Sequence, residues 1–118
     1  MPFNARELLA RIIQCEAGGE GLTGMQAVAT VVMNRVHVPG GEYFRTGGGD
    51  INNVIFQPYQ FDCARTEIGG QYNPQNIYNM RPEQIHYDIA DWAIAGNRLP
   101  DVAESLWFYN PTDAYYQT

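Results

Sequence analysis

The sequence predicts a mostly α-helical, single small domain with a central buried helix, long loops and a short extended aromatic segment. Apolar residues recur at helical spacing in three separate runs, over residues 8–13, 27–36 and 85–93. Glycine-rich stretches separate the first two runs, and no internal repeat or linker divides the chain. Since 118 residues suffice for one domain with its own core, we expect residues 1–118 to form a single unit.

The composition excludes several classes of protein. Hydrophobic residues make up 45% of the chain and aromatic residues 13%, which is too much for a disordered segment. The formal net charge is -6 and no basic stripe is present, so we expect binding neither to nucleic acid nor to an anionic membrane surface. No apolar run approaches the ~18 residues that cross a bilayer. The first residues also lack the pattern of a secretory signal peptide.

The first helix is predicted to follow Asn4, with Glu7 at the third position completing a capping box. Its apolar stripe consists of Leu8, Leu9, Ile12 and Ile13. Continuing that stripe by three residues from Ile13 reaches Glu16. We therefore expect the Glu16 carboxylate to project from the core side of the helix, provided that the helix persists that far.

A glycine-rich loop and a second helix are expected next. Glycines at positions 18, 19, 21 and 24 indicate the loop. Thr23 and Gln26 repeat the capping-box pattern and should open the helix, which runs to Val36. This helix is apolar nearly all round, as is typical of a central buried helix.

The remaining elements are less regular. Residues 37–50 are expected to form a long loop, after which Asp50 caps a short helix over residues 51–56. Residues 57–61 should be extended, because Pro58 restricts the residue before it, and residues 62–80 look irregular.

The last predicted helix starts at Pro82 and Glu83 and ends at Gly96 and Asn97. Its expected apolar face consists of Ile85, Ile89, Trp92, Ala93 and Gly96. The aromatic run "SLWFYNP", residues 105–111, is predicted to be a buried strand or extended segment.

Glu16 is the main candidate for catalysis. A carboxyl group held against apolar surface at the C-terminal end of a helix should have a raised pKa. A raised pKa is what a general acid at a glycosidic oxygen requires. The alternative is an ordinary surface glutamate at a frayed helix end.

Glu20 could be the second carboxylate of a two-carboxylate glycosidase. Gly18 and Gly19 argue against a continuous helix that would stack Glu20 on Glu16. We therefore expect Glu20 to bond backbone amides in the loop or at the start of the second helix.

The two cysteines, Cys15 and Cys63, are expected to be buried thiols rather than a bridge. Cys15 lies near a helix C-terminus beside a glutamate, a setting that disfavours a nucleophilic thiolate. His37 and His86 are far apart in sequence, and no zinc or EF-hand spacing occurs, so no metal site is predicted.

Aromatic residues with amide neighbours favour a cleft for a neutral polar ligand such as a sugar. Flat rings offer apolar contact, and amides offer hydrogen bonds in the plane of the ligand. Core packing is the alternative for each ring. The aromatic set is Tyr43, Phe44, Phe56, Tyr59, Phe61, Tyr72, Tyr78, Trp107, Phe108 and Tyr109, and the amides are Gln57, Gln60, Asn73 and Asn110.

Three segments resemble the SleB/CwlJ family of cell-wall hydrolases. "RIIQCEAGGEGLTGMQAVATVVMNRV" is similar to the family's opening motif, with E-A-x-G-E followed by A-V-A-x-V-x-x-N-R-V. "VIFQPYQF" resembles its V-I-x-x-P-x-x-F segment, and "SLWFYNP" its aromatic turn ending in Asn-Pro. The segments occur in the family's order over nearly the whole chain. The Ser-Leu-Trp opening and the absence of a signal peptide favour the CwlJ-like branch.

The resemblance implies a lysozyme-like, α+β fold that cleaves the glycan strands of spore-cortex peptidoglycan during germination. Glu16 matches the family's catalytic proton donor, and Glu20 matches the second glutamate of the motif. The residues that match segments expected to line the cleft are Gln60, Phe61, Tyr109 and Asn110. The implied location is the boundary of spore coat and cortex, with the cytoplasm as the alternative, and a spore-coat protein is a candidate partner.

Two departures from the family pattern leave questions open. The family commonly has arginine where this chain has Gly18. It also runs on past the Asn-Pro segment, so this chain, which stops at Thr118, is either a compact version or truncated at its C-terminus.

The expected reaction needs no cofactor, although calcium dependence stays open. We expect Glu16 to protonate the oxygen between muramic acid and glucosamine. Glu16 would then take a proton from the muramic 6-hydroxyl, as in a lytic transglycosylase, or from water, as in a muramidase. The alternative function is a non-catalytic peptidoglycan-binding or spore-coat structural module.

Overall fold

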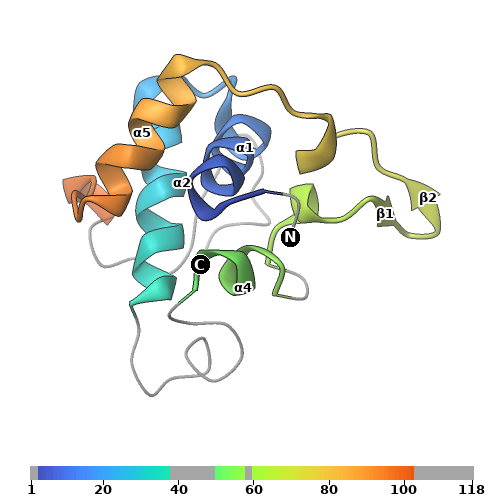
Figure 1. The fold of residues 1–118 in the computed structure, drawn as a ribbon. Coiled ribbons are helices and arrows are strands. Elements are labelled where there is room, and N and C mark those ends of the chain that lie inside the picture. Colours follow the sequence, from blue (N-terminus) through green and yellow to red (C-terminus); the bar gives the residue numbers. More distant parts are fainter. Residues whose placement is uncertain (1–2, 38–49, 58–59, 103–118) are drawn as a thin grey trace.

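Three helices that pack against one another in pairs form the body of the protein (Figure 1). They are α1 (Ala5–Ala17), α2 (Gly21–Val36) and α5 (Gln84–Ile94) in a computed structural model that describes residues 3–37, 50–57 and 60–102. The short helix α4 (Ile51–Ile55) packs against both α1 and α2. The mostly α-helical fold class is confirmed, with a small β-hairpin as its β component.

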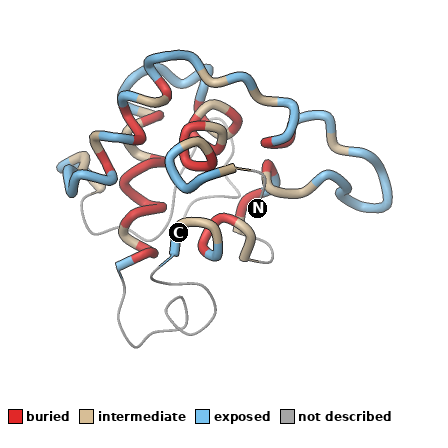
Figure 2. The backbone as a smooth tube through the Cα atoms, viewed as in Figure 1, coloured by how far each residue is buried: buried red, intermediate tan, exposed pale blue. Residues whose placement is uncertain are grey.

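The core lies where these helices meet, and Figure 2 shows buried residues on the facing sides of α1, α2 and α5. All four residues of the predicted α1 stripe are fully buried: Leu8, Leu9, Ile12 and Ile13. Buried residues occur on several sides of α2, which contacts α1, α4 and α5. The prediction of a central buried helix is therefore confirmed.

Helix α1 begins after Asn4 as predicted, but Glu7 pairs with Arg11 instead of completing the predicted capping box. The Asn4 side chain accepts a 2.8 Å hydrogen bond from the backbone N–H of Glu7, which satisfies one of the free amides of the first turn. The Glu7 carboxylate faces Arg11, from which it accepts two hydrogen bonds.

The predicted start of α2 is wrong. The helix begins at Gly21, so Thr23 and Gly24 lie inside it and the loop after α1 is confined to residues 18–20. Gly21 has a φ of 77°, a conformation that glycine adopts readily and that lets the chain reverse quickly. Inside the helix, a Cβ at Gly24 would collide with the side chain of Glu20, so the absence of a side chain permits this tight start.

The segment after α4 contains more structure than the sequence predicted. It holds the 3₁₀ turns η1 (Asp62–Ala64) and η2 (Ile77–Asn79) and an antiparallel hairpin of β1 (Glu67–Ile68) and β2 (Gln71–Tyr72). The hairpin turn is Gly69–Gly70, and both residues have positive φ, as a two-residue turn between antiparallel strands favours. This Gly-Gly pair is a hairpin signal that the prediction of an irregular segment missed.

The predicted extended run over residues 57–61 is only partly described. The Gln60 amide donates to the Gln57 carbonyl at 3.2 Å, which indicates a turn, while Phe61 is extended. Asp50 caps α4 as predicted and accepts from the amides of Asn52 and Asn53.

Helix α5 begins one residue after its N-cap, Glu83, and ends before Gly96, which has a φ of 106°. The predicted apolar face is partly wrong: Ile85 is 42% exposed, whereas His86 is buried. The His86 imidazole accepts a hydrogen bond from the Glu83 amide and so completes a capping box. A 3₁₀ turn, η3 (Pro100–Val102), then packs against α2.

The predictions for the loop over residues 38–49 and for the aromatic run at 105–111 lie outside the described residues. Across the part of the chain that the structure describes, no helix has the length and apolar character needed to cross a membrane.

Candidate active site

Glu16 lies in the last turn of α1, which continues through Ala17. The helix therefore places the carboxylate where the apolar spacing predicted, facing η1. Its Oε2 accepts a 3.4 Å hydrogen bond from the backbone N–H of Cys63. A partly buried carboxylate with a backbone partner is not a surface glutamate at a frayed helix end.

The surroundings of Glu16 raise its pKa to about 7. Loss of hydration is the largest cause, because burial disfavours the charged form. The Cys63 N–H bond and the positive charge of Arg35 lower the pKa, while the negative charge of Asp62 raises it. The carboxyl group can therefore give up or take back a proton at neutral pH.

Cys15 and Cys63 form a disulfide, so the prediction of two free thiols is wrong. Both residues are buried as expected, but their Cα atoms are only 6.2 Å apart because η1 packs against the last turn of α1. The bridge joins the neighbour of Glu16 in α1 to the residue whose amide bonds the Glu16 carboxylate.

Two amide side chains hold the segment after η1 next to this site. Gln75 donates through its side chain to the carbonyl of Cys15 at 3.3 Å, which satisfies a carbonyl near the end of α1. The Asn73 side chain donates to three carbonyls, those of Asp62, Arg65 and Gln75.

A buried arginine lies on the α2 side of the site. Arg35 is 3% exposed, and its guanidinium lies 5.2 Å from the ring centre of Phe61. Such a cation–π contact suits a charge removed from water. Phe61 is 6% exposed and belongs to the core, while Gln60 is half-buried in the preceding turn.

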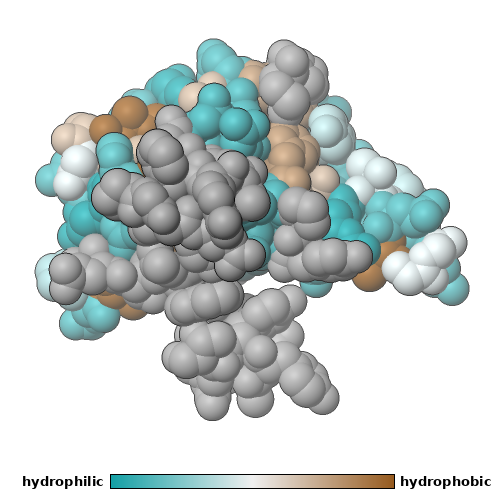
Figure 3. All heavy atoms as spheres, turned by 90° about the horizontal axis from the view of Figure 1, so that it is seen from below, coloured by the Kyte–Doolittle hydropathy of each residue, from teal (hydrophilic) through white to brown (hydrophobic). Residues whose placement is uncertain are grey.

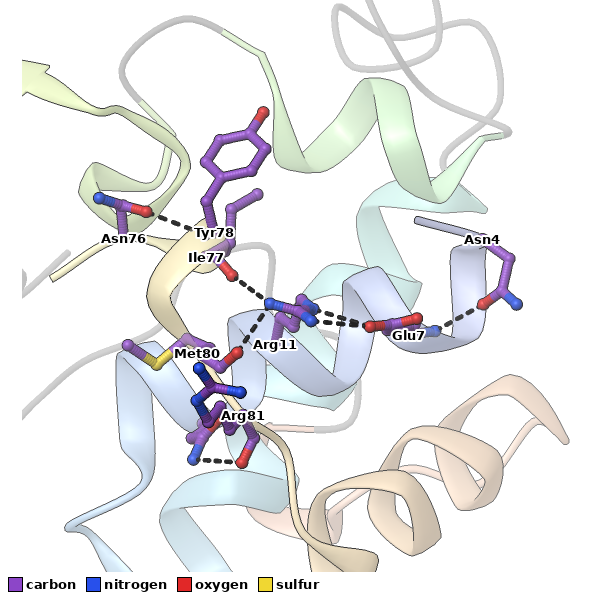
Figure 4. A network of polar contacts seen from close by, with 9 residues as sticks. Asn4, Glu7, Arg11, Asn76, Ile77, Tyr78, Met80 and Arg81 are labelled. Carbon is purple, nitrogen blue, oxygen red and sulfur yellow. Dashed lines mark hydrogen bonds and ion pairs between the residues drawn. The ribbon is translucent and has the colours of Figure 1, made fainter. Parts of the chain in front are cut away.

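Arg11 anchors the far end of the same segment to α1 (Figure 4). Its guanidinium donates to the carbonyls of Ile77 and Met80 at 2.8 and 2.7 Å and also pairs with Glu7. Residues 62–80 are thus joined to α1 at two places: beside Glu16 and, about one turn earlier in the helix, at Arg11.

The other predicted site residues are not all brought to Glu16. Glu20 is exposed at the N-cap of α2, and its side chain makes no capping hydrogen bond, so the expectation that it bonds these amides is wrong. Its side chain instead lies over Gly24. Tyr109 and Asn110 lie outside the described residues.

Asp62 and Arg35, whose charges act on Glu16, were not among the predicted site residues. Asp62 directly follows the V-I-x-x-P-x-x-F segment, and its position there was a usable signal. The carboxylate is half exposed and lies 3.7 Å from Arg65. Arg35 gave a weaker signal, as a charged residue in an otherwise apolar helix.

Gly18, where the resemblance in the sequence led us to expect arginine, ends α1. A Cβ at this position would lie 2.5 Å from the Gln14 carbonyl oxygen. The backbone of this helix end is therefore one that suits glycine.

No group of three or more metal-binding side chains occurs within residues 3–37, 50–57 and 60–102. On the face shown in Figure 3, hydrophobic residues form separate patches between hydrophilic ones. The exposed large hydrophobic residues of the described chain are spread over α2, the hairpin, η2 and α5, which does not make one continuous patch.

The chain matches a family model described as Cell Wall Hydrolase over residues 19–118, a range that begins just after Glu16. It is 28% identical over 105 residues to the cell wall hydrolase CwlJ of Bacillus subtilis, covering 89% of this chain and 66% of that relative. Identity to the CwlJ of Halalkalibacterium halodurans is 30%, with the same coverage. The CwlJ of Oceanobacillus iheyensis is 31% identical over 111 residues, 92% of this chain and 70% of the relative.

The chain thus spans about two thirds of the length of these relatives. No solved structure matches it.

Proposed function

This chain belongs to the cell wall hydrolase family, and we propose that it cleaves the glycan strands of spore-cortex peptidoglycan with Glu16 as general acid. The observation that carries the proposal is a carboxyl group whose surroundings raise its pKa to about 7. At neutral pH a large fraction of such groups holds a proton, whereas an ordinary glutamate is almost fully ionised. A general acid is most effective when its pKa lies near the working pH.

In the first step the Glu16 proton passes to the glycosidic oxygen between muramic acid and glucosamine. The bond from that oxygen to the muramic anomeric carbon breaks, and the carbon gains oxocarbenium character. Glu16 is left as a carboxylate, stabilised by the Cys63 N–H and the nearby charge of Arg35. The same residues thus favour the charged form that appears during the reaction.

In the second step the Glu16 carboxylate takes a proton from the group that attacks the anomeric carbon. If the attacking group is the 6-hydroxyl of the same muramic residue, the product is a 1,6-anhydro sugar. If it is water, the product is a reducing end. We favour the first route, because it requires no second carboxylate.

Asp62 is the group that could support the second route. Its charge acts on Glu16, and its side chain is half exposed and so accessible to water. A carboxylate at such a place can act as the base that activates water in an inverting glycosidase. The products therefore distinguish the two routes.

The test uses the full chain and purified cortex peptidoglycan, with the released fragments analysed by mass spectrometry. We expect fragments that carry 1,6-anhydromuramic ends. Fragments with reducing ends throughout would contradict the transglycosylase route and leave hydrolysis as the reaction.

Glu16→Gln keeps the shape of the side chain and removes its proton. This variant should release fragments at least about a hundredfold more slowly, within the range for loss of an acid catalyst. Glu67→Gln, which changes an exposed glutamate in β1, serves as the matched control. Unchanged release by Glu16→Gln would contradict the proposal, and binding without any cleavage by the parent chain would favour a glycan-binding module.

A further inference from the structure

The Cys15–Cys63 bridge is placed differently from a general structural crosslink. Cys15 directly precedes Glu16 in α1, and Cys63 supplies the amide that bonds the Glu16 carboxylate. One covalent bond therefore limits how far the backbone beside Glu16 can move from the residue whose amide bonds its carboxylate.

We propose that the Cys15–Cys63 disulfide is a positioning element of the active site. The intact bridge keeps η1 closed over Glu16, and its reduction opens that carboxyl group to water. This inference rests on the proposed function of Glu16 and extends it to the control of that residue.

The non-covalent links at this end of α1 are weak. The Cys63 N–H to Glu16 bond is 3.4 Å long, and the Gln75 bond to the Cys15 carbonyl is 3.3 Å. Both exceed the usual length of such bonds, about 2.9–3.0 Å. Without the bridge, these contacts and side-chain packing alone hold η1 against Glu16.

The rest of the fold has its own anchors. Arg11 holds the η2 end of the segment through bonds of 2.7–2.8 Å to backbone carbonyls. Cys15 and Cys63 are two members of a larger buried core, most of which comes from α1, α2 and α5. We therefore expect reduction to loosen η1 locally while the helices stay folded.

The charged groups that act on Glu16 come from two of the elements packed on α1: Asp62 from η1 and Arg35 from α2. On the side of α5, Asp91 pairs with Arg6 near the other end of α1. Opening η1 rehydrates the carboxyl group and moves Asp62 away, and both changes lower the pKa of Glu16. Loss of the Cys63 N–H bond acts in the opposite direction, but dehydration is the larger influence.

Reduction requires a dithiol as co-reactant. The sulfur–sulfur bond breaks, each cysteine sulfur takes up a proton, and the dithiol is oxidised to its own disulfide. Because the chain contains two cysteines, no other intramolecular bridge can respond.

The experiment measures the pKa of Glu16 by carbon NMR of the glutamate carboxyl groups, with the Glu16 signal identified as the one missing from Glu16→Gln. The full chain is titrated oxidised and in excess dithiothreitol without oxygen, with circular dichroism as the measure of helix content. We expect the pKa of Glu16 to fall by about one unit or more on reduction, with the helical signal kept. The double variant Cys15→Ala/Cys63→Ala should show the same fall without a reductant.

Arg6→Gln is the matched control, because it removes a side-chain link between α1 and α5 at the opposite end of the helix. In each redox state, the pKa of Glu16 in this variant should equal that of the parent chain in the same state. For a one-unit fall, release of peptidoglycan fragments at pH 8 should drop about tenfold on reduction.

An unchanged pKa of Glu16 in the reduced, folded protein would overturn the inference. Loss of the helical signal on reduction would also overturn it, since the bridge would then be a general staple of the fold. An active Glu16→Gln variant would refute the proposed function instead, while the NMR titration would still report on positioning.

Discussion

The backbone amide of Cys63 donates to Oε2 of Glu16 across 47 positions of sequence. Through this contact the segment after α4 closes over the end of α1 and removes much of the water around the carboxyl group. The proton that the proposed reaction requires is therefore retained because of a neighbour distant in sequence.

Glu16 should reduce the stability of the folded protein at alkaline pH. Its pKa is raised from 4.5 to about 7 on folding, so the folded state holds this proton more tightly than the unfolded state does. The stability that the bound proton contributes is complete below pH 4.5 and is lost as pH rises through 7. Glu16→Gln should therefore be more stable than the parent at pH 8, by about 1–3 kcal/mol, and similar at pH 4. Urea unfolding at the two pH values measures the difference, and an equal difference at both would contradict a raised pKa.

Asp62→Asn should lower the pKa of Glu16, because it removes a negative charge that disfavours ionisation. The loss of activity on the alkaline side should then begin about half a pH unit lower than in the parent. Asp101→Asn, at an exposed carboxylate in η3, is the control and should not shift the profile. If Asp62→Asn releases the same kinds of fragment as the parent, the result agrees with a route that uses one carboxyl group. Loss of fragments with reducing ends would instead assign Asp62 as a base.

Arg11→Met should destabilise the fold by about 2–4 kcal/mol, because it removes the donor of a partly buried carboxylate and of the Met80 carbonyl and leaves the Ile77 carbonyl with only the 3.3 Å bond from the Met80 amide. Arg6→Met removes an exposed ion pair with Asp91 and should change stability by less than about 1 kcal/mol. Urea unfolding of the two variants provides the comparison. Similar losses in both would show that Arg11 contributes no more than a surface pair.

Gly24→Ala should destabilise the protein, although alanine normally stabilises a helix interior by about 1 kcal/mol relative to glycine. The added Cβ would collide with the Glu20 side chain, whereas Gly19→Ala meets no neighbouring atom within 4 Å. Gly19→Ala is therefore the control. Adding Glu20→Gly to Gly24→Ala should restore the melting temperature. If it does not, a collision with the Glu20 side chain is not the cause of the destabilisation.

The local features of the site could be predicted because they depend on near neighbours in sequence. The spacing of Ile12, Ile13 and Glu16 determines which side of α1 the carboxylate faces, and Asn4 supplies the cap that starts the helix. The start of α2 could not be predicted in the same way. Glycines at positions 18, 19, 21 and 24 are as typical of a loop as of this helix start, in which Gly24 fits against the Glu20 side chain.

By itself, the sequence determined the helical fold class, the buried stripe of α1, the central helix α2 and the side of α1 from which Glu16 projects. The tertiary structure alone decided that Cys15 and Cys63 are joined, that Asp62 and Arg35 act on Glu16, and that Glu20 does not cap α2 through its side chain. The physical reason is the range of the interactions. Helical periodicity and capping act over three or four residues, whereas hydration and charge at Glu16 depend on how residues 62–80 pack back against α1.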